Sequence, residues 1–184
     1  MLYKRKYLIN EIFYSIQGEG RWTGLPAIFI RFANCNLSCQ FCDTDFEVKQ
    51  FLYFDEIIDH ISDYPCRTII LTGGEPALQI DRAFVGRLKR MGYKVHIETN
   101  GTIKLPSNLD WITISPKEKW IVKKGDELKV VFIGQDLDHY KDSRFKHYYL
   151  QPCSRENEFE VINRVLEDNF WKLSIQVQKT IGIK

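Results

Sequence analysis

The chain has 184 residues, of which 44% are hydrophobic and 27% are charged. This is ordinary globular composition, and the length predicts one domain over residues 1–184 rather than two. The 26 Lys and Arg residues nearly balance the 24 Asp and Glu residues, so the charge implies no nucleic-acid partner. No apolar run approaches the roughly 20 residues of a membrane span, and no secretory signal is recognisable. We expect a cytoplasmic protein with no membrane partner.

Short apolar segments that predict strands recur along the chain. They cover residues 27–33, 67–72, 94–98, 111–115, 128–133 and 148–151, with a possible seventh at 172–177. Helix-period segments lie at residues 55–61, 76–91 and 156–170, the last with an apolar stripe of Phe159, Ile162, Val165 and Leu166. Alternating strands and helices predict the α/β class with a parallel sheet. A closed eight-unit barrel needs about 250 residues, so we expect a partial, open (β/α)6-type barrel.

Three of the five cysteines lie within eight residues. Cys35, Cys39 and Cys42 have C-x3-C-x2-C spacing and follow the strand predicted at residues 27–33. Three thiolates on one loop can hold three irons of a 4Fe–4S cluster and leave the fourth iron open. A structural zinc is the alternative, and it requires a fourth ligand. The candidates for that ligand are Cys66, Cys153 and His60.

Two further motifs stand where predicted strands end. Gly73-Gly74-Glu75-Pro76 follows residues 67–72, and the next strand leads into Glu98-Thr99-Asn100-Gly101. Sites in such folds lie at the carboxyl ends of the strands. Together with the cysteine spacing, the motifs resemble the radical S-adenosylmethionine superfamily, whose open iron binds the amino and carboxylate groups of S-adenosylmethionine. Taken alone, the two glycines equally indicate a tight turn.

Longer segments resemble the 7-carboxy-7-deazaguanine synthase family within that superfamily. They are residues 12–20 and 22–31, Cys42-Asp43-Thr44, Ser115-Pro116-Lys117, Leu150-Gln151-Pro152 and residues 179–183. The resemblance implies a carbon–nitrogen lyase that converts 6-carboxy-5,6,7,8-tetrahydropterin into 7-carboxy-7-deazaguanine and ammonia on the route to queuosine. The cluster and S-adenosylmethionine carry this radical ring contraction, so no side chain is expected to be catalytic. A homodimer and an electron donor such as flavodoxin or ferredoxin are also implied.

The same resemblance implies a binding role for a set of residues. Those expected to contact S-adenosylmethionine are Phe41, Cys42, Asp43, Gly74, Glu75, Glu98, Ser115, Pro116, Lys117, Gln151, Pro152, Cys153 and Ser154. Those expected to contact the pterin are Ile16, Gln17, Gly18, Glu19, Arg31, Thr72, Gln178 and Lys184. Gln178 stands where the family usually has histidine, and at Lys184 the terminal carboxylate is expected to reach the substrate.

Three of these substrate contacts also follow from residue chemistry. If Arg31 lines the barrel, its guanidinium requires an anion, and the substrate carboxylate can bind it in a bidentate way. The alternative is an internal ion pair with a residue such as Glu98. Gln17 and Glu19 suit the amino-pyrimidinone edge of a pterin, although a surface hairpin would have a similar sequence.

Thr44 lies two residues beyond the last cysteine, where the family pattern places a magnesium ligand. A single hydroxyl binds Mg2+ weakly, so substrate oxygens and waters would complete the octahedron. The alternative is a residue that caps a turn. Two other functions remain open at this point: a radical activase that makes a glycyl radical on a partner protein, and a zinc-stabilised binding module without catalysis.

Overall fold

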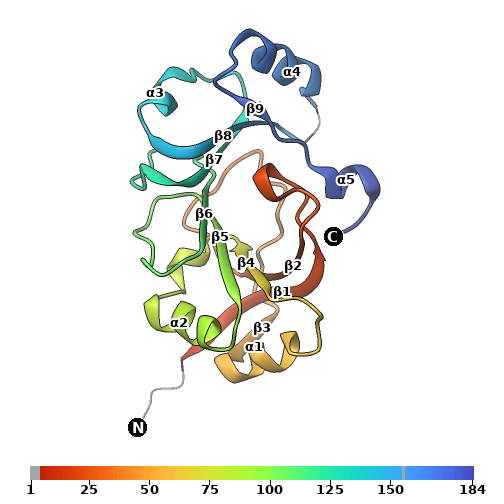
Figure 1. Ribbon diagram of the computed structural model, residues 1–184, viewed down its shortest axis with the longest axis vertical. Coiled ribbons are helices and arrows are strands. Elements are labelled where there is room, and N and C mark those ends of the chain that lie inside the picture. Colours follow the sequence, from red (N-terminus) through yellow and green to blue (C-terminus); the bar gives the residue numbers. More distant parts are fainter. Residues whose placement is uncertain (1–4, 155) are drawn as a thin grey trace. The chain divides into compact units, whose positions relative to one another are not determined.

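The computed structural model describes residues 5–154 and 156–184 (Figure 1). The chain forms two compact units, which are described in turn. The first unit consists of the chain up to Ser15, Pro26–Glu98 and Leu105–Trp111. The second consists of Ile16–Leu25, Thr99–Lys104 and Ile112–Lys184.

The strands of the first unit are β1 (Lys6–Ile16), β2 (Pro26–Phe32), β3 (Gln50–Tyr53), β4 (Thr68–Gly73) and β5 (Lys94–Thr99), in the order β3-β1-β2-β4-β5. β2, β4 and β5 pair in parallel, and β3 pairs antiparallel with β1. Apolar side chains on both faces of β2, such as Ile28, Phe29 and Ile30, are buried. This burial agrees with the continuous apolar run that predicted the strand.

Two α-helices belong to the first unit, α1 (Phe54–Ile61) and α2 (Arg82–Arg90). The helix predicted at residues 76–91 is wrong in its first part, which is the short 3-10 helix η2 (Pro76–Leu78). The predicted helix is interrupted because α2 begins only after Asp81, whose side chain accepts a hydrogen bond from Phe84 N at 2.8 Å and caps α2. In the gap, the Gln79 side chain binds the backbone of Leu8 and Ala33.

The second unit contains the strands β6 (Trp111–Ile114), β7 (Lys124–Phe132), β8 (Arg144–Pro152) and β9 (Lys172–Leu173), in that order and all parallel. The other elements of this unit are the 3-10 helix η1 (Gly20–Trp22) and the helices α3 (Asp138–Lys141), α4 (Glu158–Glu167) and α5 (Val177–Ile181). The connections from β5 to β6 and from β6 to β7 contain no helix in the described chain. None of the described helices is long and apolar enough to cross a membrane.

The predicted α/β class with an open, mostly parallel set of strands is confirmed. The six predicted strands correspond to β2, β4, β5, β6, β7 and β8. The sequence did not predict β1 and β3, and the seventh strand is limited to two residues because Val177 begins α5. The apolar stripe predicted for residues 156–170 is wrong: Phe159 and Leu166 are 83% and 78% exposed, and α4 instead buries Val161.

Candidate active site

The three clustered cysteines lie on one loop directly after β2, in the first unit. Asn34 takes a left-handed conformation with φ of 67° and turns the chain out of the strand. Cys42 N donates to Cys39 O at 3.1 Å, which closes the second half of the loop. Leu37 N points at Cys35 Sγ across 3.4 Å. None of the three thiols forms a disulfide and none is fully buried, so the loop offers three sulfur ligands.

The glycines at the end of β4 hold this loop against the sheet. A Cβ on Gly74 would lie 2.0 Å from Asn34 O and 3.0 Å from Cys35 N. Glu75 N donates to Asn34 O at 2.9 Å, and Gly74 N donates to Phe32 O at 3.0 Å. Gly73 has φ of +124°, which also favours glycine. The two glycines therefore allow β4 to contact the backbone that carries Cys35.

Glu75 is fully buried beneath the loop. Its Oε1 accepts from Ala77 N at 2.9 Å and caps η2. Burial raises the pKa of the Cys35 thiol, and the negative charge of Glu75 raises it further. Because a thiol binds metal as thiolate, cluster loading must displace this proton. The prediction that Glu75 contacts S-adenosylmethionine stays a prediction.

Two of the three candidates for a fourth zinc ligand, Cys66 and His60, belong to the first unit, and the structure places both away from the cysteine loop. Cys66 lies before β4, where its thiol donates to Pro26 O at the start of β2. The cysteine loop lies beyond the other end of β2, about 23 Å away for seven residues at about 3.3 Å each. His60 is exposed in the last turn of α1, which leads toward the start of β4.

Arg31 lies beside Thr72 across the β2–β4 pair. Its Nε donates to Glu11 Oε1 at 2.9 Å, so its ion-pair partner is Glu11 on β1 and not the Glu98 that we considered. The guanidinium also lies 5.8 Å from the Phe13 ring centre. The ion pair uses Nε, so the two Nη groups of the guanidinium lie outside this contact.

Thr44 is half-buried, and its hydroxyl donates weakly to Asp43 Oδ1 at 3.4 Å. Asp45 forms an exposed ion pair with Lys49 at 2.7 Å and accepts from Glu47 N at 2.9 Å. The hydrogen bond from Lys49 is the first cause that holds the pKa of Asp45 at about 2. Asp45 is thus already engaged by Lys49.

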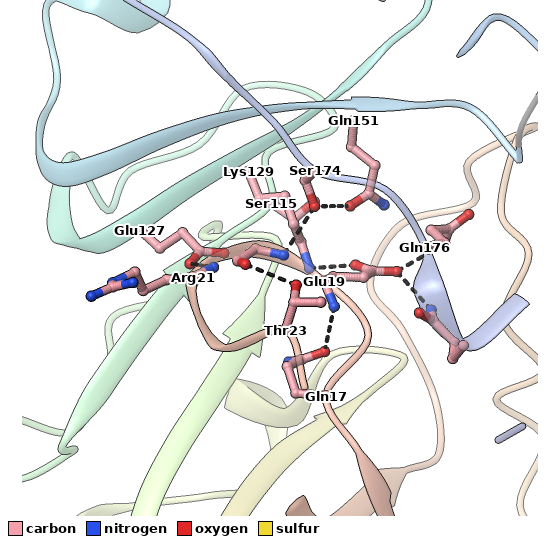
Figure 2. Close-up of polar contacts among 12 residues, drawn as sticks. Gln17, Glu19, Arg21, Thr23, Ser115, Glu127, Lys129, Gln151, Ser174 and Gln176 are labelled. Carbon is pink, nitrogen blue, oxygen red and sulfur yellow. Dashed lines mark hydrogen bonds and ion pairs between the residues drawn. The ribbon is translucent and has the colours of Figure 1, made fainter. Parts of the chain in front are cut away.

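In the second unit, the loop before β2 is built around Glu19 (Figure 2). Glu19 Oε2 receives a hydrogen bond from Lys129 Nζ at 2.5 Å, and Oε1 receives bonds from Gln176 at 2.8 Å and Gln178 at 3.0 Å. Burial alone would raise the pKa of Glu19, but the charge of Lys129 and these three hydrogen bonds outweigh it and hold the pKa at about 2. Gln17 Oε1 accepts from Glu19 N at 3.1 Å. Glu19 is therefore ionised throughout the neutral range.

Further bonds fasten the same loop to β7 and to the segment after β9. Glu127 Oε2 accepts from Arg21 N at 2.9 Å. Ser174 Oγ accepts from Gly20 N and donates to Gln151 Oε1, both at 3.0 Å. The loop is therefore an ordered part of the second unit rather than a free surface hairpin.

Gly18 and Gln178 are packed directly on each other. A Cβ on Gly18 would lie 1.7 Å from Gln178 Oε1, and Val177 N donates to Gly18 O at 3.0 Å. After α5, Gly182 adopts a left-handed conformation and Ile183 N donates back to Gln178 O at 3.0 Å. Lys184 is exposed. Ile16, the first predicted loop residue, is half-buried.

The remaining predicted S-adenosylmethionine contacts divide between the two units. In the first unit, Phe41 and Glu98 are half-buried and Asp43 is exposed. In the second, Lys117 Nζ donates to Ser115 Oγ at 2.9 Å, Cys153 N donates to Asn157 Oδ1, and Ser154 is strained with φ of 47°. Pro116, Gln151 and Pro152 are buried. Within its own unit, each residue lies at or just beyond the carboxyl end of a strand or on the cysteine loop, as predicted.

Sequence reasoning missed four polar residues of the Glu19 network: Glu127, Lys129, Ser174 and Gln176. Glu127 and Lys129 alternate on β7, and both are 3% exposed. β7 also carries Lys124 and Asp126, but Glu127 and Lys129 lie in its buried part, and their spacing of two places both on one side of the strand. That signal was present in the sequence, whereas the partner of each charge was not.

Comparison with known proteins places the chain in a class. The family model of the radical SAM superfamily matches residues 29–169, so the chain belongs to this superfamily. Enzymes of this superfamily use a 4Fe–4S cluster and S-adenosylmethionine, and the three thiols of the cysteine loop suit that cluster.

Individual relatives narrow the class to a family. The 7-carboxy-7-deazaguanine synthase of Bacteroides thetaiotaomicron is 51% identical over 96% of this chain and 98% of its own. The synthase of Bradyrhizobium diazoefficiens is 36% identical over 97% and 99%. The crystal structure of QueE from Escherichia coli matches with a TM-score of 0.79 and 28% identity, covering 94% of each chain. The chain is therefore an enzyme of the 7-carboxy-7-deazaguanine synthase family.

Proposed function

We propose that this chain is a single-domain carbon–nitrogen lyase that converts 6-carboxy-5,6,7,8-tetrahydropterin into 7-carboxy-7-deazaguanine and ammonia. The observation that carries the proposal is the 51% identity with a synthase of that name over almost the whole of both chains. The activase and zinc-module alternatives gain no support from the relatives. One domain is proposed because the superfamily match extends through both compact units.

Cys35, Cys39 and Cys42 would hold the cluster, which supplies the electron that cleaves S-adenosylmethionine when both are bound. The protein itself binds and orients the cluster and S-adenosylmethionine. Gly74 holds the cysteine loop against β4 by close backbone contact. Ser115 and Lys117 form a hydrogen-bonded polar pair beyond β6 that suits a carboxylate. The other residues proposed for S-adenosylmethionine are Phe41, Asp43, Glu75, Glu98, Pro116, Gln151, Pro152, Cys153 and Ser154.

The substrate carries an anionic carboxylate and an edge of N–H donors, and the chain has a group for each. The two Nη groups of Arg31 are proposed to form a bidentate pair with the substrate carboxylate, with Thr72 beside Arg31. The ionised Glu19, held near Gln17, is proposed for the donor edge. Ile16, Gly18, Gln178 and Lys184 are proposed to contribute to substrate binding beside Glu19.

The direct test is anaerobic turnover of the reconstituted enzyme with the carboxytetrahydropterin, S-adenosylmethionine, a reductant and Mg2+. We expect 7-carboxy-7-deazaguanine by mass spectrometry, together with one ammonia for each turnover. Deoxyadenosine without the deazapurine would show a radical enzyme with a different substrate.

Magnesium is proposed as a further cofactor, with Thr44 as its protein ligand. Thr44→Val keeps the side-chain shape and removes the oxygen. Losing a ligand or its support costs about 10- to 100-fold in metal affinity or activity, so turnover should fall by that factor and its stimulation by Mg2+ should weaken. Deoxyadenosine formation without substrate should persist. Thr68→Val, the same change at the start of β4, serves as the control, and an unchanged Mg2+ response in Thr44→Val would refute the ligand.

The partners are proposed from the family alone. They are a small electron donor such as flavodoxin or ferredoxin and a second copy of the chain in a homodimer, within the cytoplasm. Light scattering of the enzyme with its cluster reconstituted tests for the dimer. Reduction of the cluster by purified flavodoxin or ferredoxin tests each as the electron donor.

A further inference from the structure

The second unit contains a buried cation that the proposed reaction does not itself use. The Lys129 side chain is 4% exposed, lies in the middle of β7, and reaches back to Glu19, 110 residues earlier in the chain. A buried ammonium is costly unless it is paired and hydrogen-bonded. Its position therefore indicates a requirement at Glu19.

The carboxylate of Glu19 has a defined division of contacts. Oε1 receives both glutamine amides, and Oε2 receives Lys129. Each carboxylate oxygen has two acceptor positions, so one position on Oε2 remains beyond these bonds. The Glu19 side chain also keeps 13% of its surface exposed. An ionised carboxylate held in this orientation offers that position to a donor from outside the network.

We infer that Lys129 is a positioning residue, which holds Glu19 as an oriented carboxylate so that its remaining acceptor position meets an N–H donor of the pterin edge. The inference rests on the proposed function, in which Glu19 contacts the substrate. Without the cation, burial would favour the neutral acid, because the hydrogen bonds from the two glutamine amides would have to offset the desolvation without a nearby positive charge from Lys129. A neutral Glu19 would present a hydroxyl and lose strength as an acceptor.

Other ionisable groups surround the loop without contacting the Glu19 carboxylate. They are Arg21 on the loop itself, Glu127 on β7, His147 and Tyr149 on β8, and Lys179 in α5. In the described chain, Glu127 binds the backbone N of Arg21 instead. Burial, followed by the charges of Lys172 and Arg21, lowers the pKa of His147, so His147 is neutral at pH 7.

The test compares the reconstituted wild-type enzyme with Lys129→Met, Lys129→Arg and Lys124→Met. Lys124 is an exposed lysine on the same strand and serves as the matched control. In Lys129→Met, kcat/KM for the pterin should fall and should then rise about tenfold per pH unit as Glu19 ionises within the assay range. The wild type and Lys124→Met should lack this ionisation, and Lys129→Arg should recover part of the activity. Deoxyadenosine formation without substrate should be equal in all four proteins.

Two further measurements make the test decisive. The 13C NMR resonance of the Glu19 carboxyl carbon can be assigned because it is absent from the spectrum of Glu19→Gln. This resonance should not shift between pH 4.5 and 8 in the wild type and should titrate in Lys129→Met. The double variant Glu19→Gln/Lys129→Met leaves no unpaired buried charge, because both charged groups are replaced. It should therefore fold, bind substrate weakly and show no pH step in kcat/KM.

The outcomes separate the inference from the proposed function. A wild-type KM and a flat pH profile in Lys129→Met, or a pH step that survives in the double variant, would overturn the inference. If the wild type does not turn over the pterin although Glu19 titrates only in Lys129→Met, the proposed function fails and the pairing of the two charges stands.

Discussion

Replacing Cys39 by alanine should abolish both cluster assembly and turnover. Cys39 is the middle thiol of the loop, and its carbonyl accepts the bond that closes the turn toward Cys42. Two thiols hold only two irons, so a cubane with one open iron would lose a required corner. We expect no visible charge-transfer absorbance after anaerobic reconstitution, and iron, sulfide and deoxyadenosine at background.

The two cysteines outside the loop provide the controls. The Cys66 thiol donates to Pro26 O at the start of β2, and Cys153 follows β8 in the second unit. Cys66→Ala and Cys153→Ala should therefore retain full iron and sulfide content. If either variant lost the cluster as completely as Cys39→Ala, that cysteine would be a ligand and the open-iron site would be wrong.

The parallel strands could be predicted because burial on both faces leaves a continuous apolar run. β2 shows the rule, because Ile28 and Ile30 are buried on one face and Ala27 and Phe29 on the other. β1 follows a different rule, since Asn10 and Glu11 interrupt its apolar residues. Asn10 is buried because its side chain donates to Glu47 O at 2.9 Å. A bond between residues so far apart cannot be read from local composition, and the strand was missed for that reason.

Burial also explains why the helix at residues 156–170 was predicted with the wrong face. An apolar stripe shows which residues can be covered, but the face is chosen by the neighbour that is present. α4 contacts β8 and β9 and uses Val161, which leaves Phe159 and Leu166 exposed. The sequence determined the helix but not its rotation about its own axis.

Site residues that are adjacent in sequence were the predictable part. The cysteine loop and Gly73-Gly74-Glu75 each carry their chemistry within a few residues. Partners from distant segments were not predictable: Arg31 pairs with Glu11 rather than Glu98, and Glu19 pairs with Lys129. Charge alone leaves many possible partners, and the strand order of each unit selects one.

Replacing Gly74 by alanine should also disrupt the cluster, although Gly74 is not a ligand. The new Cβ would lie 2.0 Å from Asn34 O, a backbone atom that cannot move without moving Cys35. The bond from Glu75 N to Asn34 O would be broken or displaced as well. A shift of about 1 Å in a catalytic group can cost on the order of 100-fold in rate, so we expect such a loss of turnover.

The measurement that gives this prediction its meaning is iron content, because a defect limited to S-adenosylmethionine binding would leave the cluster intact. We expect iron and sulfide per chain to fall in Gly74→Ala before S-adenosylmethionine is added. Gly86→Ala is the matched control: its Cβ would meet nothing nearer than 3.5 Å inside α2, and alanine favours the helix there by about 1 kcal/mol. Full cluster content in Gly74→Ala, with only weaker binding of S-adenosylmethionine, would show that the glycine serves the ligand and that the cysteine loop does not depend on close contact with β4.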